Sequence, residues 1–190
     1  ATRALLGGDV GGYLAQLELA VRSFATSGDV RELTLERANL GFARSELGLY
    51  EEAVHVLKEA LTSAERLGLA HTAAVATQNL GVALAKLGQH EQGRALLEEA
   101  LRRFTAQRNA RMAGNTRSSS SRVLLAMGDA QGALELALAG VADLELVPPL
   151  LPGALACAAR ARLALGDTER ALDEARDAAS RVVALGQVDE

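Results

Sequence analysis

The sequence predicts an all-α fold, an α-solenoid built from antiparallel helix pairs that repeat along the chain. Glycines recur every 40 residues, and after 38 residues in the last interval, at Gly8, Gly48, Gly88, Gly128 and Gly166. The twelfth residue after each of these glycines is small, being alanine or glycine. Between the glycines, apolar residues recur at helical spacing. A period of this length is typical of a solenoid, in which each unit buries its apolar face by stacking on its neighbours.

The first complete unit lies between residues 34 and 68. Apolar residues at helical spacing predict a helix that ends at Gly48, because glycine adopts the left-handed conformation that closes a helix. A second apolar stripe follows Tyr50 and predicts a second helix, which ends near residue 68. Small side chains at Ala53 and Ala60 allow the two helices to approach closely, and a larger side chain there would cost roughly 1–3 kcal/mol.

The same helix pair can be placed over residues 74–108, 114–142 and 152–185, the last with a connection shorter by two residues. The N-terminus supplies a second helix, residues 10–25, after the stub of a first helix that four glycines weaken. We therefore expect residues 1–190 to form a single array and to be a fragment of a larger protein. Its expected units are a partial repeat, 1–28, and the repeats 29–68, 69–108, 109–146 and 147–186.

Composition narrows the classes of function. The 190 residues are 49% hydrophobic and 23% charged, which excludes general disorder, and the net charge of −4 argues against nucleic acid as a partner. The least charged stretch, residues 147–159, is too short to span a membrane and contains three prolines. The single cysteine, Cys157, and the lack of a secretion signal favour a cytoplasmic location. The dominance of arginine over lysine hints at a GC-rich bacterial genome.

Two of the repeats resemble a known family. The segment Asn39-Leu40-Gly41, followed by Gly48 and Tyr50, resembles the tetratricopeptide repeat, and residues 79–100 repeat the match. The resemblance implies a right-handed superhelix whose first helices line a concave, protein-binding groove. The 40-residue length is similar to the repeats in the sensor arms of bacterial multidomain ATPase regulators, in some serine/threonine kinases and in kinesin light chain.

The resemblance also implies which residues line the groove. The candidates for contacts with a bound peptide are Asn39, Phe42, Gln78, Asn79, Val82, Ser119, Arg122 and Arg160. Asn39 and Asn79 lie one repeat apart, and an amide both donates and accepts hydrogen bonds, as binding of an extended peptide requires. The alternative is that both are consensus residues that pack one repeat on the next.

Arg122 and Arg160 occupy equivalent positions, where earlier repeats have Phe42 and Val82. A guanidinium pairs with two oxygens of a carboxylate or phosphate, so we expect a peptide that is apolar at one end and acidic at the other. Solvated or internally paired arginines are the alternative. Directly before Arg122, the run Ser118–Ser121 either fills a tight helix contact with small hydroxyls or is phosphorylated beside a basic residue.

Sites for other chemistry are missing from the sequence. No glycine-rich loop carries a phosphate-binding lysine, the three histidines lack metal-ligand spacing, and Cys157 has no histidine near it in sequence. We therefore expect no enzyme, cofactor or metal. The expected function is a protein–protein interaction module, the sensor or scaffold arm of a larger bacterial signalling protein. The alternative is a structural element that forms homo-oligomers through the open ends of the solenoid.

Overall fold

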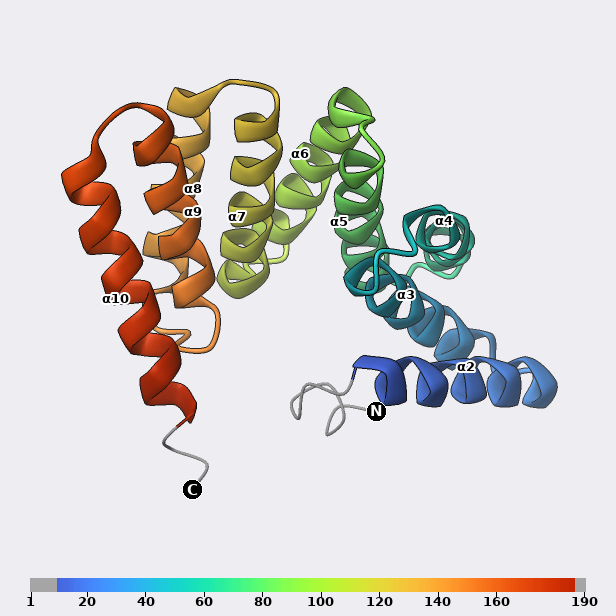
Figure 1. Ribbon diagram of the computed structural model, residues 1–190. Helices are drawn as coiled ribbons and strands as arrows, with labels where there is room; N and C mark the ends of the chain where they lie inside the picture. Colours follow the sequence, from blue (N-terminus) through green and yellow to red (C-terminus); the bar gives the residue numbers. More distant parts are fainter. Residues whose placement is uncertain (1–9, 187–190) are drawn as a thin grey trace. The chain divides into compact units, whose positions relative to one another are not determined.

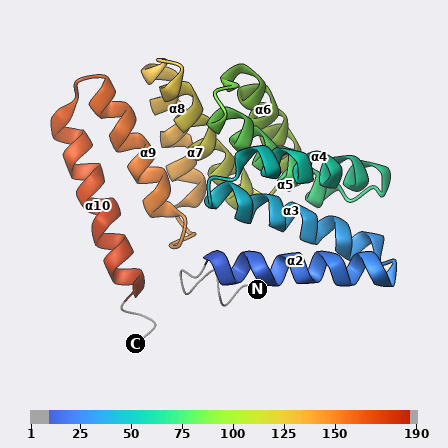
Figure 2. The same cartoon turned by 45° about the vertical axis from the view of Figure 1, so that its right-hand side comes forward.

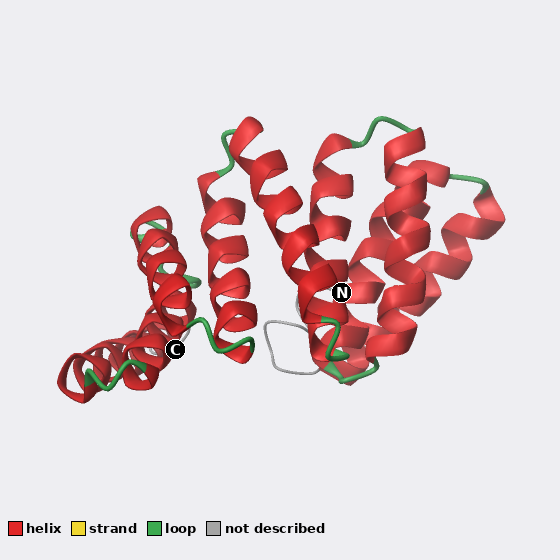
Figure 3. Cartoon of the chain, turned by 90° about the horizontal axis from the view of Figure 1, so that it is seen from above, coloured by secondary structure: helices red, strands yellow, loops and turns green. Residues whose placement is uncertain are grey.

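The computed structural model describes residues 10–186, which form helices joined by short connections (Figure 1). In this range there is no strand, as Figure 3 shows. The helices are α2 (Val10–Ser27), α3 (Val30–Glu46), α4 (Tyr50–Arg66), α5 (Ala70–Lys86), α6 (His90–Ala106), α7 (Ala110–Ala126), α8 (Ala130–Leu144), α9 (Leu151–Ala164) and α10 (Thr168–Gly186). The expected all-α fold is confirmed. The stub of a helix expected before residue 10, with Gly7 and Gly8 of its weakened start, lies outside the described residues, whereas Gly11 and Gly12 belong to α2.

The helices gather into two compact units, which divide between Glu99 and Ala100, inside α6. In the first unit, α3 packs on α2, α4 and α5. In the second, α7 and α8 form one antiparallel pair and α9 and α10 another, and α8 packs on α9. Figure 2 shows the last pair side by side. No helix between residues 10 and 186 is both long enough and apolar enough to cross a membrane.

Left-handed glycines end the helices as the sequence predicts. The backbone φ is 78° at Gly48, 81° at Gly88, 88° at Gly128 and 84° at Gly166. At the first of these turns, the amide of the following residue, Leu49, donates to the Arg44 carbonyl at 2.9 Å, which satisfies a backbone group at the end of α3. Gly8, the first glycine of the series, lies outside the described residues.

One turn breaks this rule. Arg108, between α6 and α7, has a φ of 52° and is the one non-glycine residue with positive φ in the described part of the chain. Two turns at equivalent places carry Gly28 and Gly68 instead. A side chain in this conformation costs roughly 1–2 kcal/mol, because its Cβ crowds the backbone. The repeat period predicts a turn at this point, but it does not predict the positive φ of Arg108.

Small residues hold the helix pairs together, as expected. Ala53 and Ala60 of α4 are fully buried. The helices α5 and α6 also approach closely, since a Cβ built on Gly93 would lie 2.7 Å from the backbone oxygen of Gly81. These two helices therefore meet backbone to backbone, with no room for a methyl group between them.

The first helices begin earlier than their apolar stripes predict. The sequence places the start of α3 near Thr34, but the helix begins at Val30, because the Asp29 carboxylate accepts a hydrogen bond from the Glu32 amide at 3.1 Å. Asn109 caps α7 in the same way, from the Met112 amide at 3.1 Å. The extra first turn of α3 is mostly exposed, so its residues contribute little to an apolar pattern.

Candidate functional site

The two candidate asparagines lie on first helices of the first unit. Asn39 belongs to α3 and Asn79 to α5, and both side chains are half-buried. The Asn39 Nδ2 donates a hydrogen bond to the Glu36 carboxylate at 3.4 Å, a distance at the long limit for such a bond. This weak internal bond leaves the amide able to change partner.

Three other candidates in this unit are less accessible than the sequence pattern suggests. Phe42 is half-buried and packs against a core cluster that includes Tyr13 and Leu17 of α2. Val82 is half-buried, and only 4% of Gln78 is exposed. The helix α5 packs against both α3 and α4, so a large part of its circumference is buried, and Gln78 lies in that part. The Gln78 side chain is therefore not available for contact with a ligand.

The two candidate arginines lie in the second unit, Arg122 on α7 and Arg160 on α9, and both are exposed. The Arg122 Nη2 donates to the Ser119 hydroxyl at 3.0 Å. Within residues 10–186, neither guanidinium forms an ion pair with a carboxylate. By contrast, Arg162 of α9 pairs with Glu174 at 2.8 Å.

The single cysteine, Cys157, is buried on α9. Burial raises the pKa of Cys157, while the positive charges of Arg122 and Arg160 act in the opposite direction. Arg122 lies on α7 and Arg160 on α9, and these two helices contact each other. The thiol itself donates to the Ser118 carbonyl at 3.5 Å, and its raised pKa keeps it neutral near pH 7.

The four consecutive serines of α7 are packing residues. All four, Ser118–Ser121, are buried, and the Ser118 hydroxyl donates to the Gly114 carbonyl at 3.1 Å. A Cβ on Gly140 of α8 would lie 3.1 Å from that hydroxyl, so the space around it is full. A phosphate group does not fit there, which favours small-hydroxyl packing over phosphorylation. Ser119, a candidate groove residue, is only 3% exposed, so its hydroxyl is not available for direct contact with a ligand.

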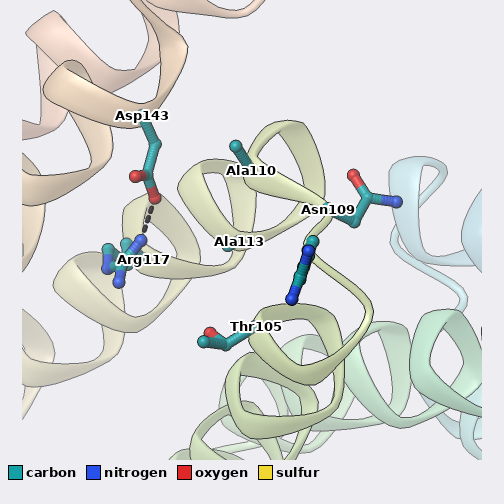
Figure 4. A pocket seen from close by; sticks show the side chains of 7 residues that line it. Thr105, Asn109, Ala110, Ala113, Arg117 and Asp143 are labelled. Carbon is teal, nitrogen blue, oxygen red and sulfur yellow. Dashed lines mark hydrogen bonds and ion pairs between the residues drawn. The ribbon is translucent and has the colours of Figure 1, made fainter.

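A separate pocket of about 210 Å³ opens at the turn between α6 and α7 (Figure 4). Its lining consists of Thr105, Arg108, Asn109, Ala110, Ala113, Arg117 and Asp143. The figure shows Arg117 and Asp143 pointing toward each other, and the two form an ion pair. Since Asp143 neutralises Arg117 and Asn109 caps α7, these polar groups serve the fold. The sequence pattern does not predict this pocket.

A metal site is not evident in residues 10–186, where no three side chains of histidine, cysteine, aspartate or glutamate lie together in a suitable group. The polar groups available on these helices are therefore the amides of Asn39 and Asn79 in the first unit, which can form hydrogen bonds, and the guanidiniums of Arg122 and Arg160 in the second unit, which carry positive charge.

Comparison with known families agrees with the repeat pattern. Two tetratricopeptide-repeat models match, one over residues 37–66 and the other over residues 74–105. These matches contain Asn39 and Asn79, the residues on which the resemblance first depended. A search of curated proteins found no matching relative. The expected resemblance to the tetratricopeptide repeat is confirmed.

Solved structures share the fold at low sequence identity. BtubC from P. vanneervenii is 17% identical with a TM-score of 0.71, over 97% of this chain and 86% of that one. A putative kinesin light chain from Podospora anserina, with TPR-like repeats, is 19% identical with a TM-score of 0.70, over 98% of this chain and 92% of that one. A signal transduction ATPase with numerous domains and a tetratricopeptide repeat sensor, from Pyrococcus horikoshii, is 20% identical with a TM-score of 0.67, over 88% of this chain and 26% of that one.

Proposed function

We propose that this tetratricopeptide-repeat protein is a protein–protein interaction module and that its second unit binds an acidic peptide segment through Arg122 and Arg160. The observation that carries the proposal is the pair of exposed guanidiniums, one repeat apart, that have no carboxylate partner within residues 10–186. Other arginines of the same unit, Arg117 and Arg162, are paired internally. A binding role therefore fits Arg122 and Arg160 better than a structural one.

Two properties of this surface favour carboxylate over a neutral ligand. A guanidinium presents a planar fork of N–H donors that matches the two oxygens of a carboxylate, and such charge-assisted bonds are roughly twice as strong as neutral ones. The neighbouring Cys157 thiol is neutral and buried, so it adds no negative charge that would repel the ligand.

In the first unit, Asn39 and Asn79 are proposed to hold the backbone of an extended peptide. The long bond between Asn39 and Glu36 costs little to exchange for a bond to a peptide amide. Phe42 and Val82, half-buried beside them, would supply the apolar part of the contact.

The proposed setting is the sensor or scaffold arm of a larger bacterial signalling protein in the cytoplasm. The Pyrococcus horikoshii ATPase, whose tetratricopeptide repeats are described as a sensor, gives a precedent for this arrangement. The complete gene tests the setting: an adjoining ATPase or kinase segment would support it, and a gene encoding no further domain would overturn it.

A peptide array tests the binding proposal. Fluorescein-labelled peptides with an Asp-Glu pair, flanked by varied apolar residues, are compared with peptides that carry Asn-Gln and an amidated C-terminus. We expect binding only to acidic peptides, and a loss of roughly 100-fold for the R122E/R160E variant, from about 1.5 kcal/mol for each charged hydrogen bond. The control is R170E, which reverses an exposed arginine on α10. Equal binding of both peptide sets, or unchanged binding by R122E/R160E, would overturn the proposal.

A further inference from the structure

The pocket at the turn between α6 and α7 lies in a strongly basic part of the chain. Residues 100–128 contain six arginines and no aspartate or glutamate, although the whole chain has a net charge of −4. Three helices contribute to the pocket, since Thr105 belongs to α6, Arg117 to α7 and Asp143 to α8 (Figure 4). Its lining contains two arginines, Arg108 and Arg117, and one aspartate, so the lining is cationic.

The two earlier turns of the same kind are not basic. A shift of 40 residues places the lining positions of α6 and α7 on the turn between α4 and α5, and a shift of 80 places them on the turn between α2 and α3. The charged residue at these positions is Glu65 in the former turn, and Asp29 and Arg37 are the charged residues in the latter. The excess of positive charge is therefore particular to the turn between α6 and α7 and is not a feature of the repeat.

Arg108 makes no contact that explains its place in this lining. Its side chain is exposed, and among the described residues its guanidinium has neither an ion-pair partner nor a hydrogen-bond partner. Gly28 and Gly68 occupy the equivalent positions, where glycine adopts a positive φ without strain. The arginine therefore costs stability at this turn, and backbone strain of this kind is concentrated at ligand sites.

Hydrogen-bond donors dominate the pocket. Arg117 donates to the Asp143 carboxylate through Nη1, which leaves its Nη2 and Nε without a partner in the part of the chain that the structure describes. The Thr105 hydroxyl also forms no hydrogen bond to a described residue. Together with Arg108, these groups offer donors from α6, from α7 and from the turn between them. Such a set suits the three terminal oxygens of a phosphate group better than the two oxygens of a carboxylate.

The volume of the pocket, about 210 Å³, limits the size of its ligand. Pockets for drug-sized molecules measure about 300–1,000 Å³, and a water molecule takes up about 30 Å³. The pocket therefore has room for a phosphate group and a few carbon atoms. Ala110 and Ala113 provide an apolar wall for the carbon atoms.

We propose that this pocket binds a phosphate monoester, which the guanidinium of Arg108 holds together with Arg117 and Thr105. The phosphate belongs to a small phosphorylated metabolite or to a phosphorylated side chain of a partner protein, since both present the same group. Neither Arg122 nor Arg160 lines the pocket, so the proposal is independent of the binding of acidic peptides.

NMR titrations that follow the backbone amides of residues 105–117 test this site at constant ionic strength. The probes are O-phosphoserine, a five-residue peptide that contains phosphoserine, and the same peptide with serine or with glutamate. We expect the phosphorylated probes alone to bind, and the tighter of the two identifies the source of the phosphate. Arg108→Gly should weaken their binding by roughly 10-fold or more, because it removes charge-assisted hydrogen bonds.

The same variant separates binding from folding. Arg108→Gly should raise the midpoint of urea unfolding while it weakens binding, because glycine relieves the positive φ. The matched control is Arg111→Ala, which removes one positive charge from an exposed residue of α7 that does not line the pocket, and it should change binding less than twofold. The proposal is overturned if neither phosphorylated probe binds the wild type, if the glutamate peptide binds as tightly, or if Arg111→Ala weakens binding as much as Arg108→Gly does.

Discussion

A methyl group added at Gly93 tests the close packing on which the repeat depends. The Cβ of Gly93→Ala would lie 2.7 Å from the Gly81 backbone oxygen, 2.9 Å from the Ala85 Cβ and 3.0 Å from the Ala85 nitrogen. None of these atoms can move away by rotating a side chain. The helices α5 and α6 would have to separate, which opens gaps along their whole contact.

The size of the effect follows from two opposing terms. Alanine stabilises a helix interior by about 1 kcal/mol relative to glycine. Overpacking costs about 1–3 kcal/mol, and backbone clashes place it at or slightly above the upper end of that range. We therefore expect a net loss of about 2 kcal/mol in the free energy of unfolding. At about 2–4 °C for each kcal/mol, Tm should fall by about 4–8 °C.

Circular dichroism during thermal and urea unfolding measures this change. Gly153→Ala is the matched control, because no atom lies within 4 Å of the added Cβ and the residue lies in helix α9. It should raise stability by up to about 1 kcal/mol through helix propensity alone. If Gly93→Ala proves as stable as Gly153→Ala, the argument for backbone-to-backbone packing is wrong.

Other substitutions test the turns and the buried thiol. Arg108→Gly should stabilise the protein by about 1 kcal/mol in urea unfolding, because it relieves the positive φ, and a loss of stability would refute that account. Asn109→Ala should cost about 1 kcal/mol in the same assay through the lost cap of α7, and no change would contradict the capping role. The pKa of Cys157 is raised in the folded protein. The contribution of this thiol to the free energy of unfolding should therefore be fully present below the pKa of an unfolded thiol, about 8.5, and should be lost as the pH rises toward the folded pKa. Urea titrations from pH 7 to 9.5 should show a flatter profile for Cys157→Ala, and identical profiles would exclude this thiol as the cause.

The architecture could be predicted from the sequence because glycine and small residues have few other roles at a fixed period. A left-handed helix end at Gly48 and close helix contacts at Ala53 follow from backbone sterics alone. The helix starts could not be predicted to the residue, because the exposed first turn of α3 carries no strong apolar signal. The strain at Arg108 likewise has no sequence signal apart from the missing glycine.

The candidate site was predicted in part. The period places Arg122 and Arg160 on equivalent positions, and in the structure both are exposed, one on α7 and the other on α9. Burial of Gln78 and Ser119 was not predicted, because it depends on how many neighbours each first helix has, which a single helix pattern does not reveal.

A charge swap between the protein and its peptide tests the proposed function most directly. An acidic peptide that binds the wild type and its Lys-Lys counterpart are titrated into the wild type and into R122E/R160E, at low and physiological salt. We predict that the variant loses the acidic peptide and gains affinity for the basic one, and that both effects weaken with salt. If the variant binds the acidic peptide as tightly as the wild type does, Arg122 and Arg160 do not form the binding surface.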